Sequence, residues 1–477
     1  MNAPAHLYQE LAARLAEAIY AGSLRTGDRL PSVRRLSEQH RVSIATAVQA
    51  YRALENQRLI EARPKSGYFV LPKPSKLAEP APSRPPVTAR FVGVNKFVME
   101  YLACSHLPGV APLGCATPSE ELYPAQRLLR LASAIARRQP NVASRYLTDT
   151  GNAKLKAAIA RRAVEFGCAL APRDIVVTNG CTEALNLALR AVAGPGDTIA
   201  LESPTYFTLL QIIESLGMKA LEVPTDPREG ISLEALDLAT QKPGAVKAVM
   251  LITNFSNPLG SLMPDEKKQA LVRLLEARGI PLIEDDIYGD AYFGRSRPFV
   301  AKAFDAGGNV ILCSSFTKSL APGFRIGWMA PGRHQQQVEL LKFINSITTP
   351  ELPQLAIAEF MGNGGFDHHL RKLRAAFLSQ VQRTSEAAAE YFPVGCKMTQ
   401  PLGGFVLWVE MPAAVDAVRL FELARDARIA VAPGPMFTNT GRFRNFLRLN
   451  CGHIWSPKLE RAIVRLGEMA KRLADSS

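Results

Sequence analysis

Cysteines are few in this sequence and are not spaced as a metal or disulfide site requires. The seven cysteines among 477 residues are an odd number, and no two of them form a Cys-x-x-Cys pair. This excludes the usual zinc-ribbon spacing and argues against a secreted disulfide framework. The adjacent His368 and His369 lack partner ligands, so we expect a surface pair and no metal site.

Membrane-spanning and secretory segments are also missing from the sequence. No apolar run approaches the roughly 20 residues that cross a bilayer. Glu10 and Glu17 interrupt the N-terminal region, where a signal peptide needs an unbroken apolar stretch. We therefore expect a soluble, cytoplasmic protein that has no membrane partner.

Length and charge indicate several domains with different partners. A chain of 477 residues exceeds one ordinary core, and an apolar content of 47% is enough for a large interior. Residues 1–90 hold 14 Lys and Arg against 7 Asp and Glu, which is half of the net charge of +14. This asymmetry predicts an N-terminal module that faces a polyanion, although a merely soluble basic domain has the same count.

The first 70 residues predict three helices and a hairpin. Apolar residues recur every four positions at Leu7, Leu11, Leu15 and Ile19. Ser32 and Ser43 are placed to cap two further short helices, which end near residues 40 and 57. Two strands over 59–63 and 68–70 then flank a Pro-Lys-Ser-Gly turn. This order predicts a helix-turn-helix with a β wing, whose last helix fits a major groove.

This order, with Gly-Asp-Arg-Leu-Pro-Ser over residues 27–32, resembles the GntR family of winged-helix regulators over about residues 7–70. The resemblance implies contacts to double-stranded DNA, mostly to phosphates, by Arg34, Ser43, Thr46, Lys65, Ser66 and Gly67. Ile44 stands where the family often has an arginine, and Ala45 and Val48 are also apolar. We therefore expect few hydrogen bonds to bases and contacts to thymine methyl groups. The alternative is a three-helix protein-interaction module that binds no DNA.

The stretch after the wing predicts a linker. Residues 71–90 contain six prolines and little that forms a core, so an extended chain with a reach on the order of 60 Å is expected. The predicted domains are a winged helix-turn-helix over 1–71, a Pro-rich linker over 72–105 and a third region over 106–477.

Short apolar runs alternate with helical patterns from about residue 140. The expected strands are Ile175–Val177, Thr198–Leu201, Ala248–Ile252, Pro281–Ile283 and Val310–Leu312. This alternation predicts an α/β domain around a mostly parallel sheet, whose ligands bind beyond the carboxyl ends of the strands. The last third of the chain predicts a smaller α+β domain.

Residues 314–328 place one lysine, Lys318, among hydroxyls and small residues. An amine with few competing charges can lose its proton and condense with an aldehyde. Ser315 and Arg325 offer a hydroxyl and a planar fork of donors, which suit a phosphate. A reactive lysine beside a phosphate-binding group is what pyridoxal 5'-phosphate requires. The alternative is that Lys318 is a solvated lysine beside a turn.

Polar residues after the other strands fit the same cofactor. Asn179-Gly180 opens a helix whose free amides can bind phosphate. Asp285, if buried, can keep a pyridine nitrogen protonated, because opposite charges stabilise each other there. Each of these features alone has an ordinary structural explanation. The prediction depends on their occurring together, each after a successive strand, with Lys318 after the fifth strand.

That order resembles the fold-type-I aminotransferases across roughly residues 110–477. The resemblance implies three catalytic residues: Lys318 as the Schiff-base lysine, Asp285 at the pyridine nitrogen and Tyr206 stacked on the ring. It also implies phosphate contacts by Gly180, Cys181, Thr182, Ser315 and Arg325. Tyr288 and Asn257 would hold the phenolic oxygen, and Asn257 and Arg448 a substrate carboxylate. Tyr146 would reach the phosphate of the other subunit of a homodimer. The Cys181-Thr182 pair departs from the usual serine followed by another polar residue.

The two halves together resemble MocR-type regulators. The resemblance implies a DNA-binding transcription regulator that senses an amine or amino acid through formation of an external aldimine. Two alternatives remain open: a working aminotransferase with a DNA-binding head, capable at least of half-transamination, and a regulator that senses pyridoxal phosphate itself.

Overall fold

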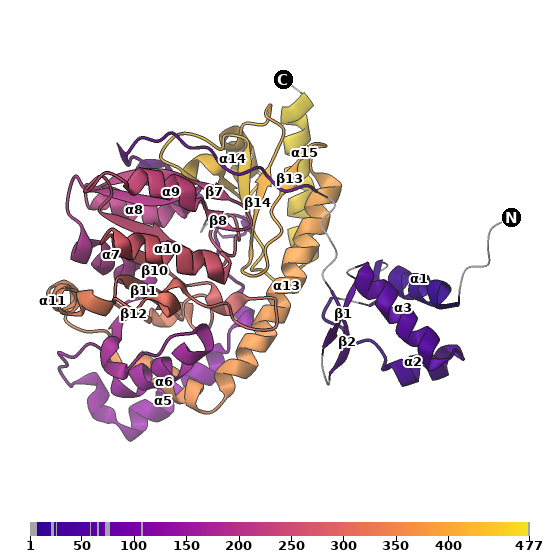
Figure 1. The fold of residues 1–477 in the computed structure, drawn as a ribbon, viewed down its shortest axis with the longest axis horizontal. Helices are drawn as coiled ribbons and strands as arrows, with labels where there is room; N and C mark the ends of the chain where they lie inside the picture. Colours follow the sequence, from indigo (N-terminus) through magenta and orange to yellow (C-terminus); the bar gives the residue numbers. More distant parts are fainter. Residues whose placement is uncertain are drawn as a thin grey trace. The chain divides into compact units, whose positions relative to one another are not determined.

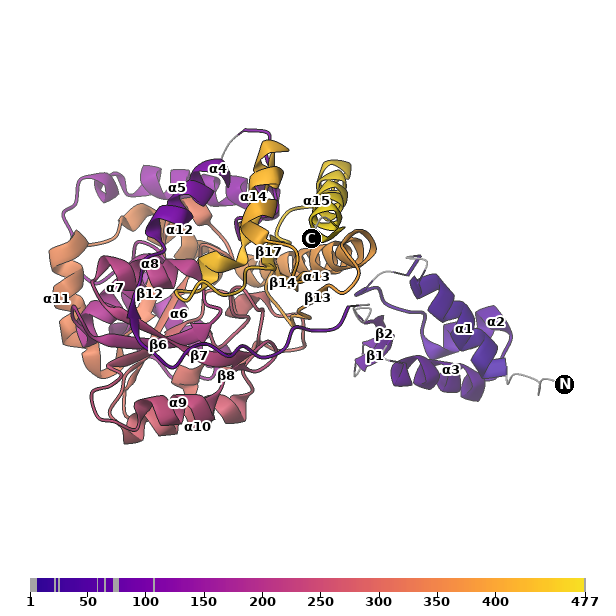
Figure 2. The ribbon, with the colours of Figure 1, turned by 90° about the horizontal axis from the view of Figure 1, so that it is seen from above.

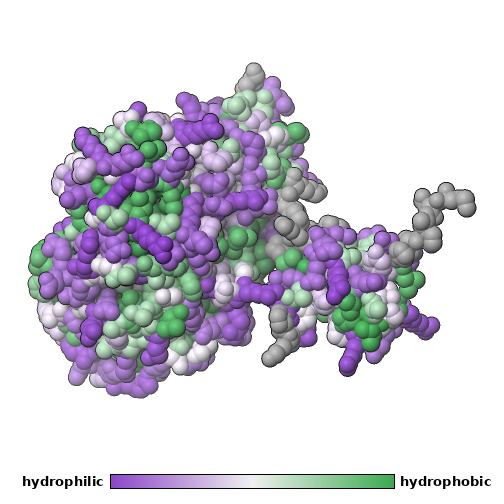
Figure 3. All heavy atoms as spheres, in the orientation of Figure 1, coloured by the Kyte–Doolittle hydropathy of each residue, from purple (hydrophilic) through white to green (hydrophobic). Residues whose placement is uncertain are grey.

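The chain divides into two units between residues 76 and 77 (Figure 1). The computed structural model describes residues 7–20, 23–24, 26–57, 59–63, 66–71, 77–105 and 108–475. We call residues 1–76 the first unit and residues 77–477 the second unit. Hydrophilic residues cover most of the visible surface, with hydrophobic patches among them (Figure 3). No helix of the described residues is both long and apolar enough to cross a membrane.

The first unit is a three-helix bundle with a two-stranded wing. Its elements are α1 (Leu7–Tyr20), α2 (Val33–His40), α3 (Ile44–Asn56), β1 (Ile60–Arg63) and β2 (Gly67–Val70). The Ser32 and Ser43 hydroxyls accept hydrogen bonds from the amides of Arg35 and Thr46, at 3.3 and 3.1 Å, so they start α2 and α3. The wing is antiparallel and pairs Ile60 with Val70. The predicted winged helix-turn-helix is confirmed.

The second unit is built on a mixed sheet. Its strands lie in the order β3 (Arg90–Phe91), β7 (Lys219–Asp226), β6 (Thr198–Ser203), β9 (Ala248–Leu251), β10 (Leu282–Asp285), β11 (Val310–Ser315), β12 (Gly327–Ala330) and β5 (Val176–Thr178), with β8 (Gly230–Ile231) beside β7. The strands from β7 to β11 are parallel, whereas β12 runs antiparallel to both β11 and β5. The predicted α/β architecture is confirmed, and its sheet is mixed.

Helices cover both faces of this sheet. They are α4 (Asn95–Ser105), α5 (Ala125–Arg138), α6 (Ala153–Ala163), α7 (Cys181–Val192), α8 (Phe207–Ser215), α9 (Leu233–Thr240), α10 (Asp265–Ala277), α11 (Gln335–Ser346) and α12 (Glu351–Gly362). Figure 2 shows α9 and α10 on one side of β6 and β7, with α8 on the other. Alternate strand residues therefore join separate cores: Ala200 packs with α10, and Ile199 packs with α7 and α8.

A smaller α+β domain completes the second unit. The long helix α13 (Gly365–Tyr391) leads into a sheet of β13 (Lys397–Met398), β14 (Val406–Glu410), β17 (Phe446–Asn450) and β16 (Ala432–Pro433). The remaining elements are α14 (Ala417–Asp426), α15 (Pro457–Asp475) and the pair β15 (Ile429–Ala430) and β4 (Ala111–Pro112).

The structure differs from the predicted linker over residues 72–105. Residues 77–105 belong to the second unit: β3 pairs with β7, and Tyr101 of α4 is fully buried. Ser83 exchanges hydrogen bonds with Thr225, donating through its amide at 3.0 Å and accepting at its hydroxyl at 2.9 Å. The prolines over residues 80–86 exclude a helix in that stretch, but an extended chain can still pair at a sheet edge and insert isolated apolar side chains.

Candidate functional site

The carboxyl ends of the central strands bring the predicted residues of the second unit together. β10 ends at Asp285 and β11 at Ser315, with Lys318 three residues further on. β5 leads into Gly180, β6 is followed by Tyr206, and β9 by Asn257. Neighbouring parallel strands end at the same edge of a sheet, so these segments form one site.

Lys318 lies at the centre of this site. Its Nζ atom donates a hydrogen bond to the carbonyl oxygen of Ala116 at 2.7 Å. Burial, helped by the positive charge of Arg448, lowers the pKa of Lys318 to about 8. The amine is therefore close to losing its proton at neutral pH, as a nucleophilic lysine must.

Asp285 is the buried acid of the site. Burial raises its pKa to about 7. Hydrogen bonds from the thiol of Cys181 at 3.4 Å and the amide of Ile287 at 3.1 Å oppose this rise, because they stabilise the carboxylate. The thiol of Cys181 thus contacts Asp285, so only the backbone of Cys181, at the start of α7, remains for the predicted phosphate contact. A positive ring nitrogen would favour the charged carboxylate.

A hydrogen-bonded row joins Tyr288, Asn257 and Arg448. The Asn257 amide donates to the Tyr288 hydroxyl at 3.1 Å, and its oxygen accepts from Arg448 Nη1 at 2.9 Å. Arg448 is 1% exposed, and its Nη2 donates to the Gly114 carbonyl at 2.6 Å. Its Nε has no hydrogen-bond partner, and within the described ranges no carboxylate pairs with this guanidinium. A buried, unpaired guanidinium suits an incoming carboxylate.

A small cradle lies between α7 and the turn after Lys318. Gly180 has φ +81°, and a Cβ atom there would lie 2.3 Å from Arg325 Nη2. Arg325 Nη1 donates to the Thr317 hydroxyl at 3.3 Å, which is 2.6 Å from the Ser315 hydroxyl. Thr317 was not predicted, although it is another hydroxyl in the motif. Thr182, by contrast, is exposed.

Two tyrosines lie in the segments of this site, and one of them contacts the lysine segment directly. Tyr206 is partly buried, with its ring centre 4.8 Å from that of Phe207. The Tyr123 hydroxyl donates to the carbonyl oxygens of Thr317 at 3.4 Å and Lys318 at 3.5 Å. No local sequence signal identified Tyr123, because its contacts span nearly 200 residues.

His369 lies differently from its prediction, and Tyr146 lies on the surface of this chain. His369 is 7% exposed and its Nε2 lies 2.8 Å from the Ser319 carbonyl oxygen, so the prediction of a surface pair is wrong for His369. Its place on the inner face of α13 explains the burial. Tyr146 is 76% exposed.

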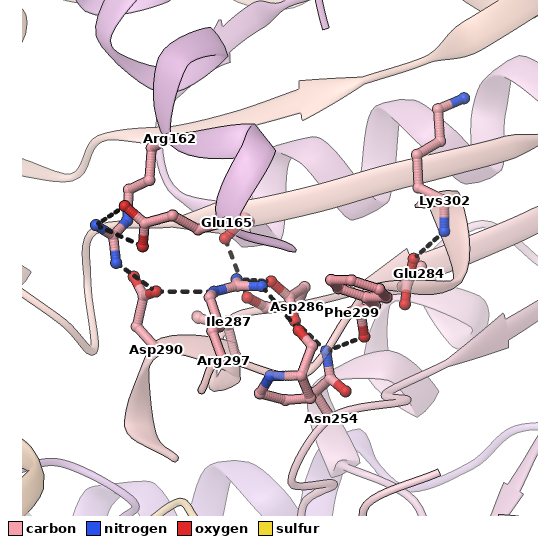
Figure 4. Close-up of polar contacts among 12 residues, drawn as sticks. Arg162, Glu165, Asn254, Glu284, Asp286, Ile287, Asp290, Arg297, Phe299 and Lys302 are labelled. Carbon is pink, nitrogen blue, oxygen red and sulfur yellow. Dashed lines mark hydrogen bonds and ion pairs between the residues drawn. The ribbon is translucent and has the colours of Figure 1, made fainter. Parts of the chain in front are cut away.

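A chain of buried ion pairs lies directly after Asp285 (Figure 4). Arg297 pairs with Asp286 and, at 2.9 Å, with Asp290, which also accepts from Arg162 at 3.0 Å. Burial alone would raise the pKa of Asp290, but the two arginines hold it well below its usual range. The network fixes the loop that follows β10, and its members were not predicted as site residues.

In the first unit, the predicted DNA contacts lie on three elements. Arg34 is exposed on α2, Ser43 and Thr46 lie at the start of α3, and Ser66 and Gly67 lie at the wing turn. Lys65 is outside the described residues. Gly67 has φ +102°, and a Cβ atom there would lie 3.3 Å from Arg29 Nε, so Arg29 is a further basic residue at the wing.

The second-unit site fits pyridoxal phosphate. The cradle at Gly180 has room only while that residue lacks a side chain, and donors surround it. The amine of Lys318 and the acid of Asp285 supply the other two groups that the cofactor requires. The unpartnered Nε of Arg448 leaves capacity for a ligand carboxylate.

Comparison with known proteins agrees with both units. Residues 119–466 match the aminotransferase class I and II family, and residues 7–70 match the gntR family of bacterial regulatory proteins. The uncharacterized HTH-type transcriptional regulator YdcR of Escherichia coli is 40% identical over 97% of this chain and 98% of its own length.

Solved aminotransferases have the fold of the second unit. Kynurenine aminotransferase of Pyrococcus horikoshii, in complex with PMP, has a TM-score of 0.73 at 28% identity and covers 79% of this chain and 94% of its own. The α-aminoadipate aminotransferase LysN of Thermus thermophilus, complexed with N-(5'-phosphopyridoxyl)-L-leucine, has a TM-score of 0.72 at 27% identity. The match covers 81% of this chain and 100% of LysN.

Proposed function

The chain belongs to the MocR type of GntR-family transcription regulators, and from this premise we propose that it binds DNA in response to an amine or amino acid held at a pyridoxal phosphate site. One observation carries the proposal: Lys318, Asp285 and Arg448 converge in a chain that also carries a capped helix-turn-helix.

The first unit would bind the DNA. Arg34 is exposed on α2, and this side chain and the amides at the starts of α2 and α3 would face phosphates, which fix the register of a protein on a duplex. The wing, with Ser66, Gly67 and Lys65, would contact the neighbouring backbone. The positive charge of this region supports that role.

The second unit would hold the cofactor and the ligand. Gly180, Cys181 and Thr182 would offer backbone amides to the phosphate, with Ser315 and Arg325 completing the cup. When bound, pyridoxal phosphate supplies an aldehyde for an incoming amine and an electron-withdrawing ring. Asp285 would pair with the ring nitrogen and Tyr206 would cover the ring face. Tyr288 and Asn257 would bond the phenolic oxygen.

Arg448 would select ligands that carry a carboxylate. Its guanidinium is oriented by Asn257 and Gly114 and lies under the ring of Phe437, 4.9 Å from the ring centre. Bidentate pairing is available only to a planar fork of this kind. We therefore propose an α-amino acid as the effector class rather than a simple amine.

A homodimer would complete the site through Tyr146. The α11 face exposes Leu340, Phe343 and Ile344, at 53%, 51% and 66%. Hydrophobic residues lie along the edge of the second unit that α11 forms (Figure 3). Exposed apolar patches of this kind mark association surfaces, which supports pairing of two second units.

Ligand binding would alter DNA affinity only if the ligand has different affinities for two arrangements of the protein. The test is a titration of the holoprotein with a panel of amino acids, following cofactor absorbance and DNA binding together. A spectral change with altered DNA affinity and no turnover supports the regulator. Sustained turnover with a keto acid would assign an aminotransferase instead.

The lysine assignment has its own test. Borohydride reduction followed by peptide mass spectrometry should place the cofactor on Lys318, and Lys318→Ala should lose it. An adduct on another side chain would remove the basis of the effector proposal and leave DNA binding untouched.

A further inference from the structure

Helix α3 presents one exposed stripe beyond the phosphate contacts expected of Ser43 and Thr46. Its opposite face is buried in the first unit through Ala47, Ala50, Tyr51 and Leu54. The exposed residues of the stripe are Ile44, Ala45, Gln49 and Arg52. Val48 is partly buried beside them. Ala45, Val48, Gln49 and Arg52 are spaced by three, four and seven positions, so they share one side of the helix. Ile44 borders this side because it lies four positions before Val48.

The stripe begins with an unusual residue for a surface. Ile44 is 56% exposed at the first turn of α3. The two hydroxyls beside it are engaged with each other, because Ser43 Oγ accepts from the Thr46 amide and lies 2.8 Å from Thr46 Oγ1. The first turn therefore presents an aliphatic group at its surface, beside two hydroxyls that contact each other.

The charge along the helix favours nucleic acid over protein as the partner. Residues 43–52 contain no Asp or Glu, and the stripe ends at Arg52. Exposed Arg34 and Arg35 lie on α2, the preceding helix. A duplex supplies both the negative charge that these arginines need and an apolar group for Ile44, which is the C5-methyl of thymine.

We propose that α3 reads A·T base pairs, with Ile44 packed against a thymine methyl and Gln49 paired with an adenine. A glutamine amide can bond the N6 and N7 atoms of adenine at once, whereas an aliphatic side chain in the major groove contacts favourably only the thymine methyl. Arg52, two turns from Ile44, contacts the phosphates that flank these pairs. This inference rests on the proposed DNA-binding function.

The experiment uses the full-length protein and DNA selected by it from a random duplex library. Each thymine of the selected site is replaced in turn by deoxyuridine, which removes one methyl group and leaves the base pairing intact. At one thymine in each half-site the wild type should bind about fourfold more weakly, the loss expected for one buried methyl. Ile44→Ala should bind the two duplexes equally.

Leu7→Ala is the matched control. Leu7 is 58% exposed and lies on α1, so its truncation removes a similar apolar surface from a different helix. This variant should keep the wild-type sensitivity to deoxyuridine. Gln49→Ala should tolerate replacement of the adenine that the wild type requires, while keeping the methyl effect.

The possible outcomes distinguish a failure of the proposed base reading by α3 from a failure of the proposed DNA binding. Failure of the wild type to enrich any sequence would refute DNA binding itself. Enrichment of a site in which no thymine methyl affects the wild type would overturn the role of Ile44 and leave DNA binding intact. Equal deoxyuridine effects on the wild type and Ile44→Ala would do the same.

Discussion

Replacing Arg297 should destabilise the second unit more than any exposed arginine does. Arg297 is 7% exposed and neutralises two carboxylates, Asp286 and Asp290. Arg297→Gln would leave Asp286, which is 2% exposed, without a cation beside it. Asp290 would keep only its ion pair with Arg162. Removing one partner of a buried pair costs about 3–5 kcal/mol, and we expect a loss of that size in the free energy of unfolding near pH 7.

Urea unfolding followed by tryptophan fluorescence measures this loss directly. All three tryptophans, Trp328, Trp408 and Trp455, lie in the second unit, so their signal is independent of the first unit. The control is Arg461→Gln on the exposed side of α15, which should change stability by less than about 0.5 kcal/mol. A second variant, Arg297→Gln with Asp286→Asn, should recover part of the loss, because it removes the stranded charge.

The pH dependence gives the same reasoning a second test. The pKa of Asp290 is depressed in the folded state, so its contribution is complete above the unfolded value near 3.9 and is lost as pH falls through the folded value. Burial raises the pKa of Asp286 even with Arg297 beside it, and loss of Arg297 must raise this pKa further. The stranded carboxylate then takes up a proton more readily, so the deficit of the variant should shrink as pH falls from 7 towards 4. A deficit within 1 kcal/mol of the Arg461 control, or one that is constant with pH, would refute the role assigned to the ion pairs.

Two further predictions concern the cofactor site. Arg448→Lys keeps the charge but loses the planar fork, so the affinity for an α-amino acid, measured by calorimetry, should fall about 10- to 100-fold, as expected when one charge-assisted hydrogen bond is lost. The amine that has the same side chain but no carboxylate should bind with unchanged affinity. An equal loss of affinity for both ligands would contradict the role of Arg448. Cys181→Ala removes the thiol that donates to Asp285, so the pKa of this acid should rise further above about 7. The cofactor is expected to bind best when Asp285 is charged, so the affinity of the Cys181→Ala apoprotein, measured by absorbance from pH 6 to 9, should reach its plateau at a higher pH than that of the wild type. An unchanged pH profile would show that the thiol does not affect Asp285.

Local signals in the sequence predicted the elements and residues that depend on near neighbours. Ser32 and Ser43 start their helices as expected, because capping involves residues only three positions apart. Lys318 and Asp285 follow strands whose apolar runs are visible in the sequence, and the parallel order then places them together.

Contacts between distant segments were not predictable in this way. Tyr123 reaches the lysine segment from a turn before α5 and His369 reaches it from α13, and neither carries a local pattern. Strand β12 is short, follows the cofactor loop directly and inserts antiparallel between β11 and β5. Residues 77–91 have a composition typical of a linker, and their defined place comes from contacts with distant segments, among them the edge of β7.

The attachment of residues 77–105 has a consequence for how the second unit avoids aggregation. The eight-residue strand β7 would be the outermost strand of the sheet without β3. Open backbone donors and acceptors along such a strand recruit strands from other molecules. The proline-rich segment over residues 80–86 continues into β3 and occupies part of this edge, and prolines lack the amide that a further strand would need. A fragment that begins at residue 77 keeps this protection, whereas one that begins at residue 106 exposes the edge to self-association.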